Sequence, residues 1–374
     1  MERSLIRTQE ESKVSGNITV LQLITGLGVG GAERIVMELA GRLTDYRYRS
    51  LVVALNGDSG LMTQYGDVDF QVISMGMRKN PWSFIRAATA LIKMVRRERV
   101  SLIHAHMFHA LCVAVICKII VPGVKIVFTS HSTDGFSRLR RTLISATSAL
   151  RDVDVLFMPE QHCEMNAART TVIPNGVHVD SANTGNMNRI RLRRVFLFVG
   201  RLEPAKDPIA LVRAFAAMRQ KNCELWVAGD GVLRREVERE IRTLGIDDRV
   251  HLLGIRHDVP QLLRQVDCFV MSSRWEGLPI AILEAGAAAL PVVAPPVGAI
   301  PSLLDDDCGY LVQASELQRA LDAVMDDYTD ASRRGKRFHD KINNKFSLDQ
   351  MSRAHADLYN SLVCCESTFP IRGC

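Results

Sequence analysis

The chain has 374 residues, a formal net charge of +6, 47% hydrophobic residues and 24% charged residues. This length and composition favour a soluble globular protein of two domains over a disordered chain. The longest apolar run, residues 110–121, is interrupted by Lys118 and is shorter than the ~20 residues that cross a bilayer, while basic clusters without interleaved aromatic residues argue against nucleic-acid binding.

Apolar runs alternate with amphipathic helical patterns from residue 18 onward. The alternation predicts βαβ units and a parallel sheet. In the first half we expect strands over residues 18–25, 50–55, 70–73, 102–105, 125–129, 155–158 and 171–173. Helices are expected between them over residues 32–43, 81–97, 110–120 and 138–150.

The same alternation starts again after a polar stretch rich in Gly and Asn. Strands are expected over residues 195–199, 224–228, 250–253, 268–271 and 291–294, and helices over 208–219, 233–244, 259–266, 280–289, 315–328 and 348–362. The predicted fold class is therefore α/β, with two doubly wound, Rossmann-like domains that face each other across a cleft at the carboxyl ends of both sheets. The predicted boundaries are a flexible tail at 1–16, a first domain at 17–179, a linker at 180–194 and a second domain at 195–345.

The most informative motif carries two carboxylates, Glu276 and Glu284, across the start of an expected helix. Pro279 favours the first helical position, because its missing N–H costs nothing there. A helix N-terminus approached by Gly277 and Leu278 suits an anion, and two carboxylates beside it suit the hydroxyls of a sugar. We expect Glu276 in the loop and Glu284 facing outward from the second turn. A capped surface helix is the alternative.

A glycine-rich turn follows the first strand and ends with Gly30 and Gly31. It satisfies the pattern G-x-G-x-x-G, in which backbone amides approach a phosphate or a sugar. A dinucleotide site also requires an acidic residue about 20 residues further on, and Asp58 comes late for that role. A dinucleotide-binding oxidoreductase is therefore kept as an alternative.

The corresponding turn of the second half contains Gly200, Arg201 and Lys206. Two cations at the mouth of a sheet suit a diphosphate, which Arg binds bidentately and Lys binds as a point charge. A loop whose cations pair with its own carboxylates, Glu203 and Asp207, is an equal alternative.

Gly229, Ile255 and Arg256 lie in the turns after the next two strands and could hold a base against backbone groups, although ordinary turn chemistry explains each of them. His131 follows the strand 125–129 and is expected to face the cleft. Metal binding by His104, His106 and His109 is less favoured, because no carboxylate accompanies them. The D-x-D patterns at residues 67–69 and 152–154 precede strands, so we attribute them to chance.

Together these motifs resemble glycosyltransferase family 4, the retaining sugar-nucleotide transferases of the GT-B fold. The resemblance extends over about residues 18–362. It rests on Gly30-Gly31-Ala32-Glu33, Ile173-Pro174-Asn175-Gly176-Val177, Val199-Gly200-Arg201-Leu202 with Lys206, Ala228-Gly229-Asp230-Gly231, Leu253-Gly254, Glu276-Gly277-Leu278-Pro279 with Glu284, Pro291-Val292-Val293-Ala294 and Gly298-Ala299-Ile300-Pro301. Residues 346–374 look like the family's final helix, which crosses back to the first domain, plus a tail.

The resemblance implies a role for each motif. Arg201 and Lys206 would hold the nucleotide diphosphate, Glu284 would bind the ribose hydroxyls, and Glu276 would bind the donor sugar with residues 277–279 beside it. Gly30 and Gly31 would contact the phosphates, His131 would lie near the reaction centre, and Ile255 with Arg256 would lie against the base. No metal or other cofactor is implied. Some relatives carry a His in the helix after the double Gly, where this chain has Glu33 and Arg34.

The resemblance also implies a nucleotide-sugar donor, most often UDP-linked, and a glycan or lipid-linked saccharide acceptor in bacterial surface-polysaccharide synthesis, such as that of lipopolysaccharide, O-antigen or capsule. A catalytically inactive sugar-binding homologue is the other alternative. Nine scattered Cys and a polar N-terminus indicate a cytoplasmic protein. An apolar stripe beside basic residues in 136–150 could rest on the inner membrane, or pack on its own sheet. The stripe consists of Phe136, Leu139, Leu143 and Leu150.

Overall fold

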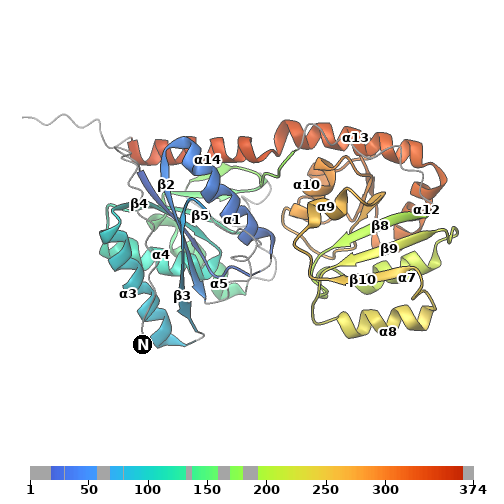
Figure 1. The fold of residues 1–374 in the computed structure, drawn as a ribbon. Helices are drawn as coiled ribbons and strands as arrows, with labels where there is room; N and C mark the ends of the chain where they lie inside the picture. Colours follow the sequence, from blue (N-terminus) through green and yellow to red (C-terminus); the bar gives the residue numbers. More distant parts are fainter. Residues whose placement is uncertain are drawn as a thin grey trace, which may run out of the picture.

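The computed structural model describes residues 18–28, 30–56, 68–78, 80–131, 137–158, 169–179 and 193–364. Two parallel sheets form the centres of two α/β domains that lie side by side (Figure 1). The predicted fold class is thereby confirmed. The expected tail 1–16, Asp58, Phe136 and residues 180–192 of the expected linker lie outside the described residues.

The first sheet has seven strands in the order β3-β2-β1-β4-β5-β6-β7. Its strands are β1 (Ile18–Ile24), β2 (Tyr48–Asn56), β3 (Gln71–Met77), β4 (Val100–His106), β5 (Lys125–Thr129), β6 (Val153–Leu156) and β7 (Thr170–Val172). Its helices are α1 (Gly31–Arg42), α3 (Pro81–Arg97), α4 (Phe108–Ile120) and α5 (Arg138–Ala146), with 3-10 turns η1 (Leu43–Tyr46) and η2 (Ser148–Leu150).

Both faces of this sheet are covered, which explains why its strands are nearly continuous apolar runs. Successive strand residues point to opposite faces. Leu102 packs with α1 and the last helix, whereas Ile103 packs with α3 and α4. The carboxyl ends of β1, β4 and β5 therefore emerge between two helical layers.

The second sheet has the order β10-β9-β8-β11-β12-β13. Its strands are β8 (Arg194–Val199), β9 (Cys223–Ala228), β10 (Val250–Gly254), β11 (Cys268–Val270), β12 (Val292–Ala294) and β13 (Tyr310–Leu311). Its helices are α7 (Pro208–Ala217), α8 (Arg234–Leu244), α9 (Val259–Leu263), α10 (Ile280–Ala287), α11 (Ile300–Leu303), α12 (Leu317–Asp326) and α13 (Tyr328–Lys345), with the 3-10 turn η4 (Ala314–Glu316). Phe196 and Leu197 illustrate the alternation, because they pack in the cores on opposite faces.

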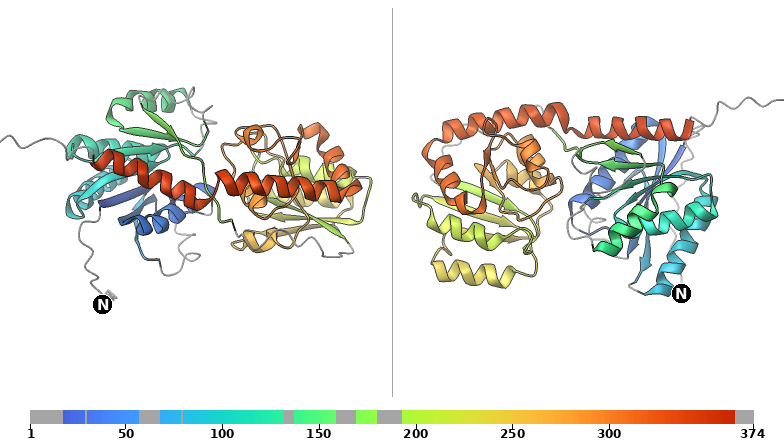
Figure 2. Two further views of the ribbon diagram at one scale, coloured as in Figure 1. Left: turned by 90° about the horizontal axis from the view of Figure 1, so that it is seen from above. Right: turned by 180° about the vertical axis from the view of Figure 1, so that it is seen from behind.

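The chain ends with α14 (Leu348–Cys364), which leaves the second domain and packs on the first (Figures 1 and 2). Backbone bonds on both sides of Val177 hold the crossing point, from its N–H to Phe346 O at 2.9 Å and from the N–H of Leu348 to its carbonyl at 3.0 Å. Tyr359 of α14 is fully buried against the first sheet. The last helix is thus part of the first domain's core.

Most element boundaries lie within a few residues of those predicted, but some helices differ. α10 begins at Ile280 with Pro279 as its N-cap, so Pro279 is not the first helical residue. α13 was not predicted, and α5 ends at Ala146 before the turn η2. Among the described helices, none combines the length and apolarity that crossing a membrane requires.

Candidate functional site

The centre of the candidate site is an ion pair at the carboxyl edge of the second sheet. β8 and β11 are neighbours, so the loops that follow them meet. Lys206 Nζ donates to Glu276 Oε1 at 2.5 Å, and Ser273 Oγ donates to the same oxygen at 2.5 Å. The Glu276 side chain is 7% exposed. The buried carboxylate is therefore compensated by a cation and a hydroxyl.

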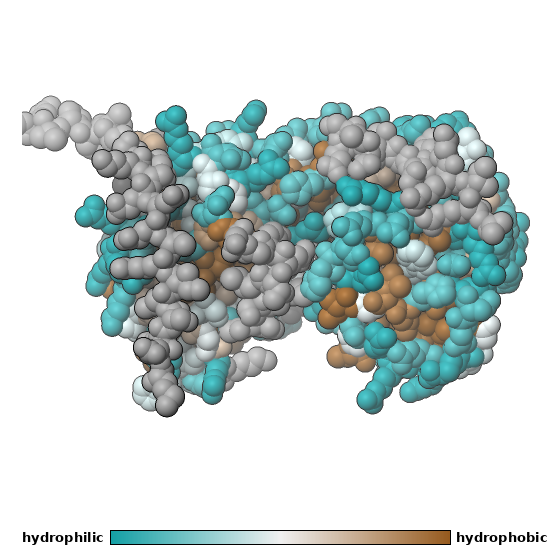
Figure 3. Space-filling model, in the orientation of Figure 1, coloured by the Kyte–Doolittle hydropathy of each residue, from teal (hydrophilic) through white to brown (hydrophobic). Residues whose placement is uncertain are grey.

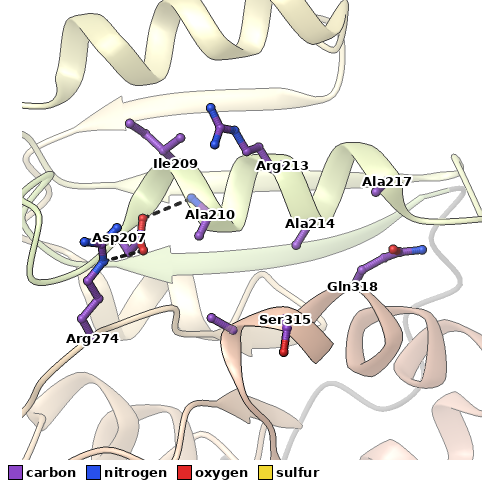
Figure 4. Close-up of a pocket in the computed structure, with 10 residues that line it drawn as sticks. Asp207, Ile209, Ala210, Arg213, Ala214, Ala217, Arg274, Ser315 and Gln318 are labelled. Carbon is purple, nitrogen blue, oxygen red and sulfur yellow. Dashed lines mark hydrogen bonds and ion pairs between the residues drawn. The ribbon is translucent and has the colours of Figure 1, made fainter.

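The turn that carries Lys206 is supported by hydrogen bonds from the segment after β11. Asp207 has a left-handed backbone (φ 44°) and accepts a bond from the N–H of Ala210 at the start of α7. Arg274 Nε donates to Asp207 Oδ2 at 2.7 Å (Figure 4), and Ser272 Oγ donates to the Lys206 carbonyl at 2.8 Å. The pocket in Figure 4 lies between α7 and the segment of η4 and α12, with Asp207 and Arg274 at one end. These contacts fix the backbone from which the Lys206 side chain projects.

The loop of Glu276 is also supported from the other side. The Ala299 N–H donates to the Gly277 carbonyl at 3.1 Å. Gly298 has φ 57°, and a Cβ there would overlap the carbonyl oxygen of Glu276. A Cβ on Gly277 would lie 3.1 Å from the His131 carbonyl oxygen, so the first domain reaches this loop. Leu278 is buried beneath it.

Glu284 differs from its prediction. Instead of facing outward, its side chain is 11% exposed and forms an ion pair with Arg34 of α1. Burial raises the pKa of Glu284, and Arg34 opposes that shift. The prediction was wrong because the first domain covers this face of α10, and a single helix's sequence does not reveal that contact.

Gly30 and Gly31 lie where α1 approaches α10. A Cβ on Gly31 would be 2.9 Å from Ile280 Cδ1, so the starts of the two helices touch. The Glu33 side chain folds over Gly30, and burial raises the pKa of its carboxyl. Arg201 of the second domain lowers the same pKa. The start of α1 is thus close enough to the second domain for its charge to be felt.

The other predicted donor residues are arranged along the same edge. Arg201 has a 68% exposed side chain and pairs with Glu203 at 2.8 Å, as the alternative of a self-paired loop anticipated. Gly229 (φ 145°) lies against the carbonyl of Gly200. The turn after β10 is two strands from β8.

In that turn, Arg256 pairs with Asp258 through two bonds of 2.8 and 2.6 Å. Ile255 is 55% exposed. Apolar side chains also gather over β8–β10 in Figure 3. This turn is brought to the correct edge of the sheet but not into contact with Lys206 or Glu276.

His131 belongs to a hydrogen-bonded network in the first domain. Its Nε2 lies 3.0 Å from His106 Nδ1, and His106 Nε2 lies 2.8 Å from Gln22 Oε1. The amide oxygen of Gln22 accepts, so His106 donates through Nε2 and accepts from His131 through Nδ1. Gln22 Nε2 in turn donates to the hydroxyl of Tyr359 at 3.4 Å, and that hydroxyl lies 2.6 Å from His104 Nδ1. The network therefore fixes the orientation of the His131 ring. Its Nε2 carries the proton and donates to His106, and its Nδ1 carries a lone pair that does not take part in that bond.

Burial keeps these histidines neutral. It lowers the pKa of His131 to about 3, and it lowers the pKa values of His104 and His106 well below the usual range. His355 of α14, whose ring centroid lies 5.5 Å from that of His104, is also buried, and its pKa is lowered to about 4. Charge repulsion from other rings adds to this effect for His104, His106 and His131. At pH 7 the network therefore works through hydrogen bonds rather than through charge.

Acid should destabilise the protein through these histidines. Their folded pKa values lie below the unfolded value of about 6.5, so the unfolded chain binds more protons as pH falls and stability is lost below that value. We expect a loss of about 1–2 kcal/mol per histidine between pH 6.5 and 5, measured as a falling Tm. His355→Gln should reduce this acid sensitivity, and His251→Gln, at a partly exposed position in the second domain, serves as the control. An unchanged Tm between pH 7 and 5 would contradict the assignment.

Other predicted features are structural. Asp152 binds Lys118 and the N–H of Ile126, and Asp154 pairs with Arg151 in the interior, so the second D-x-D pattern is used in folding. Within the described ranges, no group of three or more His, Cys, Asp or Glu is arranged to hold a metal ion.

Sequence reasoning missed the partners that complete the site. Ser273 bonds to Glu276, and His106 bonds to His131. Gln22 bonds to His106 and so supports His131 indirectly. The available signal was their position at or near a strand end. Arg34 had no such signal, because it stands in an amphipathic helix.

Comparison with known proteins agrees with the fold. Residues 29–181 match the family described as Glycosyltransferase Family 4, and residues 193–327 match the family described as Glycosyl transferases group 1. The chain is 26% identical, over an alignment of 340 residues, to the UDP-Gal:alpha-D-GlcNAc-diphosphoundecaprenol alpha-1,3-galactosyltransferase of Escherichia coli, and the match covers 82% of this chain and 88% of that protein. It is 28% identical to the putative glycosyltransferase EpsF of Bacillus subtilis over 73% of this chain and 78% of that one.

Solved structures agree as well. HepE of Anabaena in complex with UDP and glucose superimposes with a TM-score of 0.79 at 20% identity, covering 92% of this chain and all of that one. The galactosyltransferase WaaB gives a TM-score of 0.71 at 15% identity, with 92% and 100% covered. The two family matches and the fold define a glycosyltransferase with two Rossmann-like domains. The chain belongs to the glycosyltransferases of the GT-B fold, with a Glycosyltransferase Family 4 domain followed by a Glycosyl transferases group 1 domain.

Proposed function

We propose that this protein transfers a hexose-type sugar from a UDP-linked donor to a glycan or lipid-linked saccharide, with retention of the anomeric configuration, in the synthesis of a bacterial surface polysaccharide. The observation that carries the proposal is the largely buried pair of Lys206 and Glu276, which lies beside the loop that the first domain reaches through His131. The E. coli relative, named for UDP-Gal and a diphosphoundecaprenol-linked GlcNAc, supports the donor and acceptor classes.

In this proposal, the second domain holds the donor. Lys206 and Arg201 bind the diphosphate, Glu284 accepts hydrogen bonds from the ribose hydroxyls, and Ile255 and Arg256 border the base. Glu276 accepts hydrogen bonds from the sugar, with the 277–279 loop beside it. Lys206 then lies between the diphosphate and Glu276, so one cation serves two negative groups.

The first domain completes the reaction centre. His131 presents Nδ1 as an acceptor toward a sugar hydroxyl, and Gly30 and Gly31 approach the phosphates through their backbone. As the bond between the anomeric carbon and the phosphate oxygen breaks, negative charge grows on the UDP. Lys206, Arg201 and the start of α1 favour that state without reorganising. These groups supply the positive charge, so the proposal includes no metal.

The acceptor hydroxyl attacks the anomeric carbon from the face that the diphosphate leaves. Its oxygen forms the new glycosidic bond, and its proton passes to a phosphate oxygen of the departing UDP. No protein residue needs to act as the base, because the leaving group provides it. The configuration at the anomeric carbon is thereby kept.

A panel of nucleotide sugars tests the function. UDP-glucose, UDP-galactose, UDP-N-acetylglucosamine and GDP-mannose would each be offered with a diphospholipid-linked sugar, and nucleotide release and product anomer would be measured by NMR. One UDP sugar should react, with retained configuration. Release from none of them would favour an inactive homologue, an inverted product would remove the retaining mechanism, and tight NAD(P) binding without UDP binding would favour the oxidoreductase.

We also propose that the first domain rests on the anionic face of the inner membrane, on the cytoplasmic side. On α5, Leu139 and Leu143 are 68% and 42% exposed and are one turn apart. Exposed Arg138, Arg140 and Arg141 lie on the same short helix. Apolar side chains flanked by cations suit a negatively charged lipid surface.

Vesicle sedimentation tests this surface. The protein should bind vesicles that contain phosphatidylglycerol and remain unbound with phosphatidylcholine alone. Leu139→Gln with Leu143→Gln should weaken binding while leaving nucleotide release from a soluble acceptor unchanged. Equal binding of the double variant and the unaltered protein would exclude this surface.

A further inference from the structure

The ion pair between Arg34 and Glu284 joins the two domains at the edge of the candidate donor site. Arg34 lies in the first turns of α1, and Glu284 lies in the second turn of α10. Arg34 Nη1 donates to Glu284 Oε1, and the two side chains are 24% and 11% exposed. The close approach of Gly31 to Ile280 shows that the helix starts are in contact around this pair.

The charges around the pair come from three segments. Glu38 lies one turn beyond Arg34 on α1 and accepts a bond from His178 Nε2 at 3.2 Å. Arg34 and His178 lower the pKa of Glu284, whereas burial and Glu38 raise it. Arg34 is therefore the cation in direct contact with Glu284, and it opposes the rise in the pKa of that carboxylate that burial causes.

The geometry leaves part of Glu284 available to a ligand. An ionised carboxylate has two oxygens and about four acceptor positions, and Arg34 bonds to Oε1. The pair therefore orients the group without using all of its hydrogen-bonding capacity. A guanidinium also restricts its partner more than a flexible ammonium would.

We infer that Arg34 is a positioning residue: from the first domain, it holds Glu284 so that the remaining acceptor positions bind the ribose hydroxyls of the donor. The inference rests on the proposed function for the role of Glu284. It follows that the second domain binds a nucleotide fully only when the first domain is seated on it. Arg34 thus couples closure of the two domains to recognition of ribose.

The test compares UDP with 2′,3′-dideoxy-UDP, which lacks both ribose hydroxyls. We expect Arg34→Met to weaken UDP binding about tenfold and to bring the ratio of the two affinities close to one, as Glu284→Gln should do. The double variant should lose no more than either single variant, because both changes remove one interaction. Arg34→Lys should restore part of the preference.

A matched control is available on the same helix. Arg42 pairs with Asp349 of α14, away from the donor site. Arg42→Met should keep the full preference for UDP over the dideoxy analogue, and Tm values would verify that each variant is folded. A merely structural role of Arg34 would lower the Tm without changing the ratio.

The outcomes separate the inference from the proposed function. If Glu284→Gln loses the preference but Arg34→Met retains it, the inference is wrong and the site assignment stands. If Glu284→Gln retains the preference, the assignment of Glu284 fails first. Small-angle scattering gives a readout without nucleotide: Arg34→Met should increase the radius of gyration, and an unchanged radius would overturn the closure role.

Discussion

Lys206→Met is expected to lower kcat by a factor of about 10²–10³, the effect of removing one preorganised charge from a site where negative charge develops. The Lys206 ammonium contacts Glu276 and, in the proposed complex, the diphosphate. Met keeps the length of the side chain and removes its charge. Release of UDP from the preferred donor, measured at saturating substrate, gives the comparison.

The matched control for this variant is Arg213→Met. Arg213 is an exposed cation on the neighbouring helix α7, and it pairs with Glu240 of α8. Its removal should leave kcat within about twofold, since exposed pairs contribute little. Glu276→Ala should lower turnover comparably to Lys206→Met. A Lys206→Met enzyme with near-normal kcat would remove Lys206 from the reaction centre.

Gly298→Ala is expected to lower turnover more than tenfold with a smaller effect on folding. Gly298 has φ 57°, and an added Cβ would overlap the carbonyl oxygen of Glu276. The backbone cost of a left-handed Ala is about 1–2 kcal/mol, but the overlap additionally displaces the Glu276 loop. A displacement of about 1 Å can cost 10²-fold in rate, and both kcat and Tm would be measured.

Gly245→Ala separates the two effects. Gly245 ends α8 with φ 61°, and a Cβ there would meet no atom within 4 Å. This variant should show the backbone cost in its Tm and a normal kcat. Equal losses of turnover in the Gly245 and Gly298 variants would mean that the contact with Glu276 has no catalytic importance.

The fold could be predicted largely because its elements repeat a simple pattern. Residues 81–97 combine an Asn-Pro start, an apolar stripe and a basic end, and α3 has the predicted bounds. α13 was missed because its sequence is mostly polar, and its buried residues pack on α10. That contact depends on tertiary structure and not on the helix's own periodicity.

The site was predictable to the extent that it lies at strand ends. Lys206 and Glu276 are each placed by the end of a strand, but their contact depends on β8 and β11 being neighbours, which no local pattern encodes. The partner of Glu284 lies 250 residues away on the other domain. Contacts of this kind form only when the two domains pack together, so they cannot be predicted from the sequence pattern of either domain alone.

The position of α14 has a consequence for synthesis of the chain. The first domain leaves the ribosome first, yet Leu348, Met351 and Tyr359 fill one side of its core, and the Tyr359 hydroxyl is hydrogen-bonded to His104. At about 5–20 residues per second, the domain must wait roughly ten seconds or more for these side chains after its own last strand is made. Until then, part of one apolar face of its sheet is uncovered. The domain that begins first is completed last, and a chain interrupted before α14 would be a target for chaperones and proteases.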